Sequence, residues 1–134
     1  MDKPRIFRST ETSEGMRNDV QYSENENRGA VRKALQVSAM LQTEGGPAIG
    51  GKTVDISTSG ICVLTNYSLA TGESWLIEFD LQLDGKVYHF EAVGMVAQRV
   101  VASNGIRIGF QFKRVSMASL IAISRYMREA PAWT

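Results

Sequence analysis

The chain has 134 residues, of which 43% are hydrophobic and 22% are charged, and its formal net charge at pH 7 is +1. These values are typical of one soluble globular domain, and they exclude a bulk electrostatic binder of long nucleic acid, which carries a strong basic excess. No stretch approaches the roughly 20 apolar residues that span a bilayer, and no apolar segment follows Met1 as in a secretory signal.

Cysteine and histidine usage excludes two further classes of protein. Cys62 is the single cysteine, so an internal disulfide bond cannot form, and we expect a reducing, cytoplasmic location. One cysteine and one histidine also cannot build the usual zinc site made of those two residue types.

The first 27 residues differ in composition from the rest. They carry four basic and six acidic residues, and their few apolar residues follow no sustained period. Polar runs of this kind bury too little surface to offset the entropy of ordering, so we expect residues 1–27 to form a flexible tail. The alternative is a short helix that docks on the domain through Ile6 and Phe7.

From residue 28 to residue 130 the sequence has the pattern of an all-β domain. Short segments rich in Val, Ile, Phe and Tyr are separated by turns that contain glycine. Asp84-Gly85 and Asn104-Gly105 are typical two-residue hairpin turns, and Gly94 is expected to bend or bulge a long strand. We predict a six-stranded antiparallel β-barrel, because a meander of hairpins must hide its edges. The predicted strands lie within residues 33–42, 53–57, 61–66, 74–83, 87–101 and 106–112.

Residues 116–128 are predicted to form a C-terminal helix. Ser116 is suited to cap its first turn, and Arg125 and Arg128 lie near its end, where cations favour the helix dipole. The apolar residues of this segment share one broad face, which we expect to pack on the barrel rather than on a membrane or a cofactor. Pro131 ends the helical run.

Two short motifs carry the candidate chemistry. Arg28 and Arg32 form RxxxR just before the first strand, and Asp55, Ser57 and Gly60 form DxSxxG at the next strand-to-strand turn. In a shuffled chain of this composition RxxxR arises about 0.7 times, whereas DxSxxG arises only about 0.04 times. The two motifs together, in this order, are therefore a specific signal.

The residue types in these motifs suit a guanine nucleotide. The planar guanidinium groups of Arg28 and Arg32 can bind O6 and N7 of guanine, stack on a base or pair with a phosphate. The carboxylate of Asp55 can accept from the N1–H and N2–H₂ edge of guanine. Ser57 can bond a phosphate or ribose oxygen, and Gly60 allows a tight backbone and a close approach of the ligand. The alternative is structural, since Asp and Ser at this spacing also cap a β-turn.

With these motifs on a six-stranded barrel that is followed by a helix, the sequence resembles the PilZ domains. The resemblance covers residues 28–128 and includes the glycine-containing last strand around Gly109-Phe110-Gln111-Phe112. PilZ domains are bacterial receptors for cyclic di-GMP. The resemblance therefore implies a ligand-binding protein without catalytic activity or cofactor, in which the ligand contacts are Arg28, Arg32, Asp55, Ser57 and Gly60.

The resemblance also implies how such a receptor works and leaves alternatives open. Binding would order the segment around Arg28 and Arg32 and change the surface shown to a partner protein. Asn27 stands where many members carry a further arginine, so one or two ligand molecules could bind. The alternatives are a scaffold of the same fold that binds no nucleotide, and a binder of single-stranded nucleic acid. Glu78 and Asp80, which alternate with aromatic residues, disfavour the latter.

Four further residues have expected roles that depend on their places in the strands. We expect His89 to be a solvated or hydrogen-bonded strand residue and Cys62 to be a small buried hydrophobe. Arg99 and Arg107 are expected on the paired strands of the last hairpin, where most such charges are solvated, and they are secondary candidates for ligand contacts.

Overall fold

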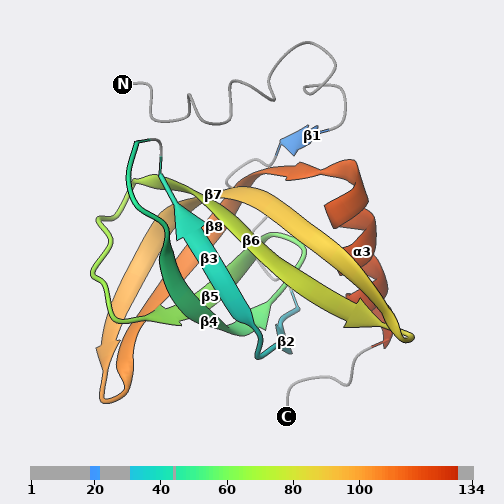
Figure 1. The fold of residues 1–134 in the computed structure, drawn as a ribbon, viewed down its shortest axis with the longest axis horizontal. Coiled ribbons are helices and arrows are strands. Elements are labelled where there is room, and N and C mark those ends of the chain that lie inside the picture. Colours follow the sequence, from blue (N-terminus) through green and yellow to red (C-terminus); the bar gives the residue numbers. More distant parts are fainter. Residues whose placement is uncertain (1–18, 22–30, 44, 130–134) are drawn as a thin grey trace.

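The computed structural model describes residues 19–21, 31–43 and 45–129 of the chain (Figure 1). Arg28 and most of the expected tail lie outside these described residues. The elements are β1 (Asp19–Gln21), β2 (Lys33–Ala34), β3 (Ser38–Gln42), β4 (Ile49–Ile56), β5 (Gly60–Thr65), β6 (Ser74–Leu83), β7 (Lys86–Ala102), β8 (Gly105–Ser116) and α3 (Met117–Glu129).

Strands β3 to β8 close into an antiparallel barrel. Around the ring the order is β8-β5-β4-β3-β6-β7, and β7 pairs with β8 to complete it. Both predicted hairpin turns join neighbouring strands, and positive φ angles at Asp84, Gly85 and Gly105 explain the residues found there. The predicted six-stranded barrel with a C-terminal helix is thus confirmed.

Strand β1 is an addition to the predicted barrel. It lies within the segment expected to be a flexible tail, and it pairs with the end of β8, with Asp19 opposite Ser116 and Gln21 opposite Arg114. Three residues of that segment are therefore tied to the sheet by a short antiparallel ladder.

The single strand predicted over residues 33–42 is divided into β2 and β3. The Thr53 side chain explains the interruption, because its buried hydroxyl donates to the Leu35 carbonyl and accepts from the Val37 N–H at 2.9 Å. Strand β4 bulges at the same point, between Thr53 and Asp55. A side chain inserted between the two strands thus takes the place of part of the regular ladder.

The barrel interior is filled by alternate residues of its strands. Trp75, Ile77, Phe79 and Leu81 on β6 are all buried, as their period of two predicted. Phe79 stacks on Phe90 of β7, with ring centroids 4.5 Å apart. Because the side chains with even numbers on β6 face outward, the wall of the barrel also offers a polar outer surface.

Helix α3 packs against β7 and β8 and is joined to the barrel by polar contacts. The Ser116 hydroxyl accepts from the Ser119 N–H at 3.1 Å, which confirms the predicted N-cap. The Tyr126 hydroxyl donates to the Ala34 carbonyl of β2, and Arg125 donates to the Tyr88 hydroxyl at 3.0 Å. Within the described part of the chain, no helix has the length and apolar character required to cross a membrane.

Candidate functional site

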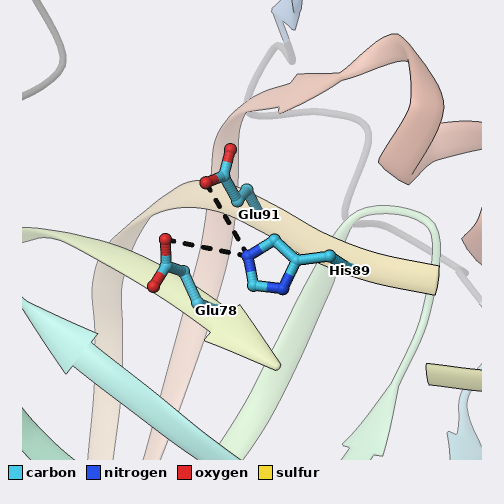
Figure 2. Close-up of side chains that lie close together, drawn as sticks. All are labelled: Glu78, His89 and Glu91. Carbon is cyan, nitrogen blue, oxygen red and sulfur yellow. Dashed lines mark ion pairs between the residues drawn. The ribbon is translucent and has the colours of Figure 1, made fainter. Parts of the chain in front are cut away.

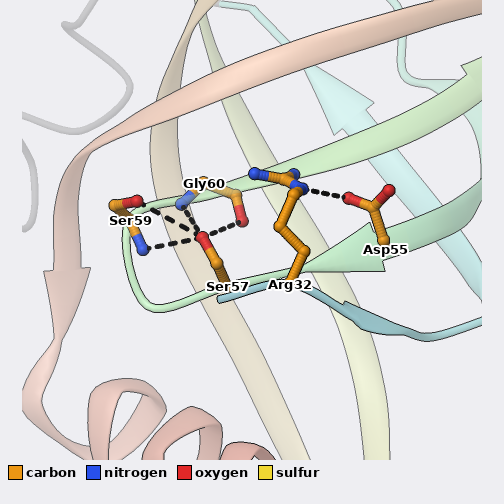
Figure 3. A network of polar contacts seen from close by, with 5 residues as sticks. All are labelled: Arg32, Asp55, Ser57, Ser59 and Gly60. Atoms are coloured by element: carbon orange, nitrogen blue, oxygen red, sulfur yellow. Dashed lines mark hydrogen bonds and ion pairs between the residues drawn. The ribbon is translucent and has the colours of Figure 1, made fainter. Parts of the chain in front are cut away.

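The turn between β4 and β5 is held by the hydroxyl of Ser57. This oxygen accepts from the N–H groups of Ser59 at 3.1 Å and Gly60 at 3.2 Å, and it also lies 3.4 Å from the Gly60 carbonyl (Figure 3). It also lies 3.3 Å from the Ser59 hydroxyl, and these four contacts use the whole capacity of one donor and two acceptor sites. Ser57 is also fully buried, so its hydroxyl serves the turn in this arrangement rather than an external ligand.

Gly60 is required by the neighbouring strand. A Cβ atom at this position would lie 2.4 Å from the carbonyl oxygen of Phe110 on β8, which is closer than any real contact. Gly60 has no positive φ, so its role is not a left-handed backbone. The glycine of the motif therefore allows β5 and β8 to approach each other, and Gly60 is itself buried.

Arg32 and Asp55 form the part of the site that the two motifs build together. The Arg32 guanidinium donates through Nε to Oδ1 of Asp55 at 2.6 Å, across 23 residues of sequence (Figure 3). The Arg32 side chain is 39% exposed and that of Asp55 is 17% exposed. The geometry thus brings the second arginine of RxxxR onto the aspartate of DxSxxG, at a surface that solvent reaches.

A row of outward-facing residues runs from this ion pair across four strands of the barrel. Asp55 lies opposite Cys62, Cys62 opposite Gly109, and Gly109 opposite Gln98. Gly109 has no side chain and therefore leaves a depression in the middle of the row. A Cβ atom there would lie 3.1 Å from Cγ of Gln98. Strand β7 bulges between Val96 and Gln98, which sets the direction of the Gln98 side chain.

This row is the floor of a cavity of about 600 Å³. A volume of this size is within the range of small-molecule and cofactor sites. Two cations, Arg32 and Arg107, and one anion, Asp55, line the cavity. Amide groups, backbone and apolar side chains supply the rest of the lining: Cys62, Ala97, Gln98, Val100, Gly109, Phe110 and Gln111.

The charges around the cavity act on the Cys62 thiol. Partial burial raises its pKa above the ordinary value, and the negative charge of Asp55 raises it further. The guanidinium groups of Arg32 and Arg107 act in the opposite direction. Cys62 is only partly buried, so it is not the buried hydrophobe expected from the sequence. Its raised pKa keeps the thiol protonated and unreactive near neutral pH.

The five residues selected from the sequence therefore divide into three groups. Arg32 and Asp55 line the cavity, whereas Ser57 and Gly60 shape the turn beside it. Arg28 is outside the described residues. The structure adds Gln98, Gly109 and Gln111 to the lining. For Gly109 and Gln111 the partial signal in the sequence was the glycine-containing strand around Gly109, whereas Gln98 lies on β7.

The two arginines of the last hairpin have different surroundings. Arg107 lies on β8 two residues from Gly109 and faces the cavity. Arg99 lies on β7 and donates to the Ser68 hydroxyl at 2.8 Å and to the Leu69 carbonyl at 3.3 Å. Arg99 thus fastens the loop before β6, and only Arg107 is part of the cavity lining.

Comparison with protein families identifies the PilZ domain over residues 26–129, a span that includes both motifs. It confirms the resemblance inferred from RxxxR and DxSxxG, and the comparisons indicate no catalytic family. A search of curated protein sequences finds no match.

Solved structures with the same fold come from several bacteria. The inhibitor of motility of Bacillus subtilis (MotI/DgrA) is 21% identical with a TM-score of 0.66, and the match covers 75% of this chain and 49% of that one. YcgR of Escherichia coli, solved in complex with c-di-GMP, is 20% identical with a TM-score of 0.60 and coverages of 75% and 44%. The isolated PilZ domain of YcgR with c-di-GMP is 20% identical, with a TM-score of 0.56 and coverages of 77% and 93%. The matched region is about half of the first two proteins, and at these identities the likeness shows the fold.

Proposed function

The chain belongs to the PilZ domain family, and on this basis we propose that it is a cytoplasmic receptor that binds cyclic di-GMP in the cavity at Arg32, Asp55 and Arg107. The observation that carries the proposal is the meeting of the two motifs at one cavity, through the 2.6 Å contact between Arg32 and Asp55. The structures of YcgR and its PilZ domain in complex with c-di-GMP support the choice of ligand.

The groups around the cavity match the chemistry of this ligand. Cyclic di-GMP carries two phosphate anions and two guanine bases. The guanidinium of Arg32 can bind the O6 and N7 acceptors of one guanine or a phosphate, and Arg107 offers a second cation from the facing strand. Asp55 can accept from the N1–H and N2–H₂ edge of guanine. The floor at Gly109 has no side chain, so a flat base can approach the backbone closely.

Ser57 and Gly60 contribute to the proposed site by positioning it. The Ser57 hydroxyl fixes the turn and Gly60 lets β5 lie against β8, and both keep Asp55 at the edge of the cavity. Arg28 would add a third guanidinium, from the segment before β2. A rigid turn combined with arginines from a separate segment lowers the entropy lost when the ligand binds.

We expect binding to change the Arg32–Asp55 contact. A guanine that bonds both side chains replaces one direct ion pair by contacts to each partner. The resulting change near β2 would alter the surface that the protein shows to an effector protein, through which we propose that the signal passes. The alternative is a scaffold that binds protein but no nucleotide, in which the Arg32–Asp55 pair is a structural contact.

A calorimetric titration tests the proposal and separates it from the scaffold alternative. We expect the full chain to bind cyclic di-GMP, and GTP and cyclic AMP to bind far more weakly. Arg32→Ala should cost about 2–4 kcal/mol of binding free energy, as for removal of a desolvated charged partner. Arg32→Lys should also weaken binding because the planar fork is lost. Asp55→Ala should reduce the preference for guanine more than the attraction to phosphate.

The matched control is Arg128→Gln, which removes one positive charge from the exposed end of α3. This variant should bind like the wild type, since its effect on the cavity is only a screened long-range field. Arg32→Ala with undiminished affinity, or no binding by the wild type at low salt, would contradict the proposal and favour the scaffold.

A further inference from the structure

A second cluster of polar groups lies on a different wall of the barrel, on the outer face of β6 and β7. Glu78 is directly opposite Glu91, and Asp80 is directly opposite His89 in the strand register. All four side chains point outward, because the residues between them on each strand, Phe79 and Phe90, fill the core. The cluster shares no residue with the lining of the cavity at Arg32.

The two glutamates lie directly opposite each other on neighbouring strands. Like charges directly opposite each other on neighbouring strands repel and destabilise the pairing. The structure places the His89 ring between them, with Nε2 at 3.9 Å from Oε2 of Glu78 and 3.8 Å from Oε2 of Glu91 (Figure 2). Both carboxylates therefore face the same nitrogen atom.

The other ring nitrogen of His89 is already engaged. Nδ1 lies 3.1 Å from Oδ1 of Asp80 and is placed to donate a hydrogen bond to it. A carboxylate bonded to one nitrogen fixes the tautomer of an imidazole and leaves the lone pair of the other nitrogen available to a metal ion. In this tautomer the lone pair of Nε2 is directed toward the two glutamates.

We propose that Glu78, His89 and Glu91 form a binding site for a divalent transition-metal ion such as Zn²⁺. One donor atom from each residue lies within 4.8 Å of the other two. Ligand atoms around a tetrahedral zinc ion are about 3.4 Å apart, given zinc–ligand distances of about 2.1 Å. The Glu78 side chain is partly exposed and that of Glu91 is exposed, so rotations of the two side chains toward Nε2 can close the difference.

The donor set and its surroundings select the class of metal. Imidazole favours Zn²⁺, Ni²⁺ and Cu²⁺ over Mg²⁺ and Ca²⁺, which prefer an all-oxygen set with more ligands. A hollow of about 250 Å³ beside the cluster, lined by Ser38, Met40 and His89 among others, has room for water on the remaining coordination positions. Asp80 on β6 would stay outside the coordination sphere and hold the ring.

A zinc titration of the full chain without a purification tag tests the site. His89 is the only histidine, so the ring nitrogen signals in NMR spectra are assigned without ambiguity. We expect one equivalent of Zn²⁺ to shift the Nε2 signal, and millimolar Mg²⁺ to leave it in place. By calorimetry, His89→Gln and Glu78→Gln should each weaken zinc binding by at least about 10-fold, the loss typical even of an outer-shell partner.

Asp84→Asn is the matched control, because it neutralises an exposed carboxylate at the tip of the same hairpin but outside the cluster. Its zinc affinity should stay within about threefold of the wild type. Zinc affinity that is unchanged in His89→Gln, an Nε2 signal that zinc does not move, or displacement of zinc by equal Mg²⁺ would each overturn the proposal. None of these measurements depends on cyclic di-GMP.

Discussion

At the residue scale, the pKa of the Cys62 thiol depends on the charged residues that line the cavity. Its pKa is raised by burial and by Asp55, and the charges of Arg32 and Arg107 oppose that rise. We predict that Asp55→Asn lowers the pKa of Cys62 and that Arg107→Gln raises it, because each variant removes one of these charges. The pH dependence of alkylation by iodoacetamide measures both shifts, since Cys62 is the only thiol. Profiles that move in the same direction in the two variants would contradict this account of the cavity.

His89 gives the chain a pH-dependent contribution to stability. Its pKa is raised above the ordinary 6.5, first by the hydrogen bond to Asp80 and also by the charges of Glu78, Glu91 and Asp80. A group whose pKa is higher in the folded state stabilises the fold below its unfolded pKa, and this contribution disappears as the pH rises through its folded pKa.

His89→Gln should therefore destabilise the protein more at about pH 5.5 than at about pH 9. The loss should be less than about 1 kcal/mol, because the ring is half exposed and solvent screens its ion pairs. Urea unfolding in the presence of a metal chelator measures the difference at each pH. A difference that grows with rising pH has the wrong sign and would refute the assignment.

At the residue scale, the sequence predicted which residue types line the cavity better than it predicted where each side chain points. Arg32 and Asp55 were selected by residue type and spacing, and they do meet at the cavity. Ser57 was selected by the same motif, yet its hydroxyl forms hydrogen bonds within the turn. A serine hydroxyl can accept from the backbone N–H two residues later, so this bond forms locally and without a ligand. Gln98 could not be selected, since its position depends on a bulge in β7 that leaves no clear pattern in the sequence.

At the scale of elements, two strand glycines, Gly60 and Gly50, differ in how closely a neighbouring strand approaches them. A Cβ atom at Gly60 would meet the Phe110 carbonyl at 2.4 Å, whereas one at Gly50 has nothing within 4 Å. We predict that Gly60→Ala lowers the free energy of unfolding by at least about 2 kcal/mol, because β5 must move away from β8. Gly50→Ala should stay within about 1 kcal/mol of the wild type. Thermal unfolding of both variants checks this, and equal losses would show that the contact between β5 and β8 is not tight.

The elements themselves were predicted well where alternation is regular. Strand β6 has the bounds expected from the sequence, residues 74–83, because its apolar residues alternate over its whole length. The break between β2 and β3 was not predicted, since it depends on the Thr53 side chain of another strand. Alternation reports which face of a strand is buried, whereas a contact between strands that are distant in sequence determines where pairing stops.

At the scale of the whole molecule, the barrel links the cavity to α3 through β2. Arg32 lies at the cavity, and two residues later the Ala34 carbonyl accepts from the Tyr126 hydroxyl on the helix. A ligand that holds Arg32 would also restrict β2, and the helix would follow through this bond. The helix also lies close to the cavity, because α3 packs on β7 and β8, and residues of these two strands line the far side of the cavity.

We predict that cyclic di-GMP slows amide hydrogen exchange in α3 of the wild type and that Tyr126→Phe removes most of this effect. Tyr126→Phe should cost about 1 kcal/mol of stability, the usual value for one hydrogen bond, and should change ligand affinity little, because Tyr126 is outside the cavity. Tyr88→Phe is the matched control: it also removes a hydroxyl that bonds α3, but its partner is Arg125 and its strand is β7. That variant should keep the ligand-dependent slowing. If both variants retained it, the helix would be coupled to the cavity through the barrel wall instead of through β2.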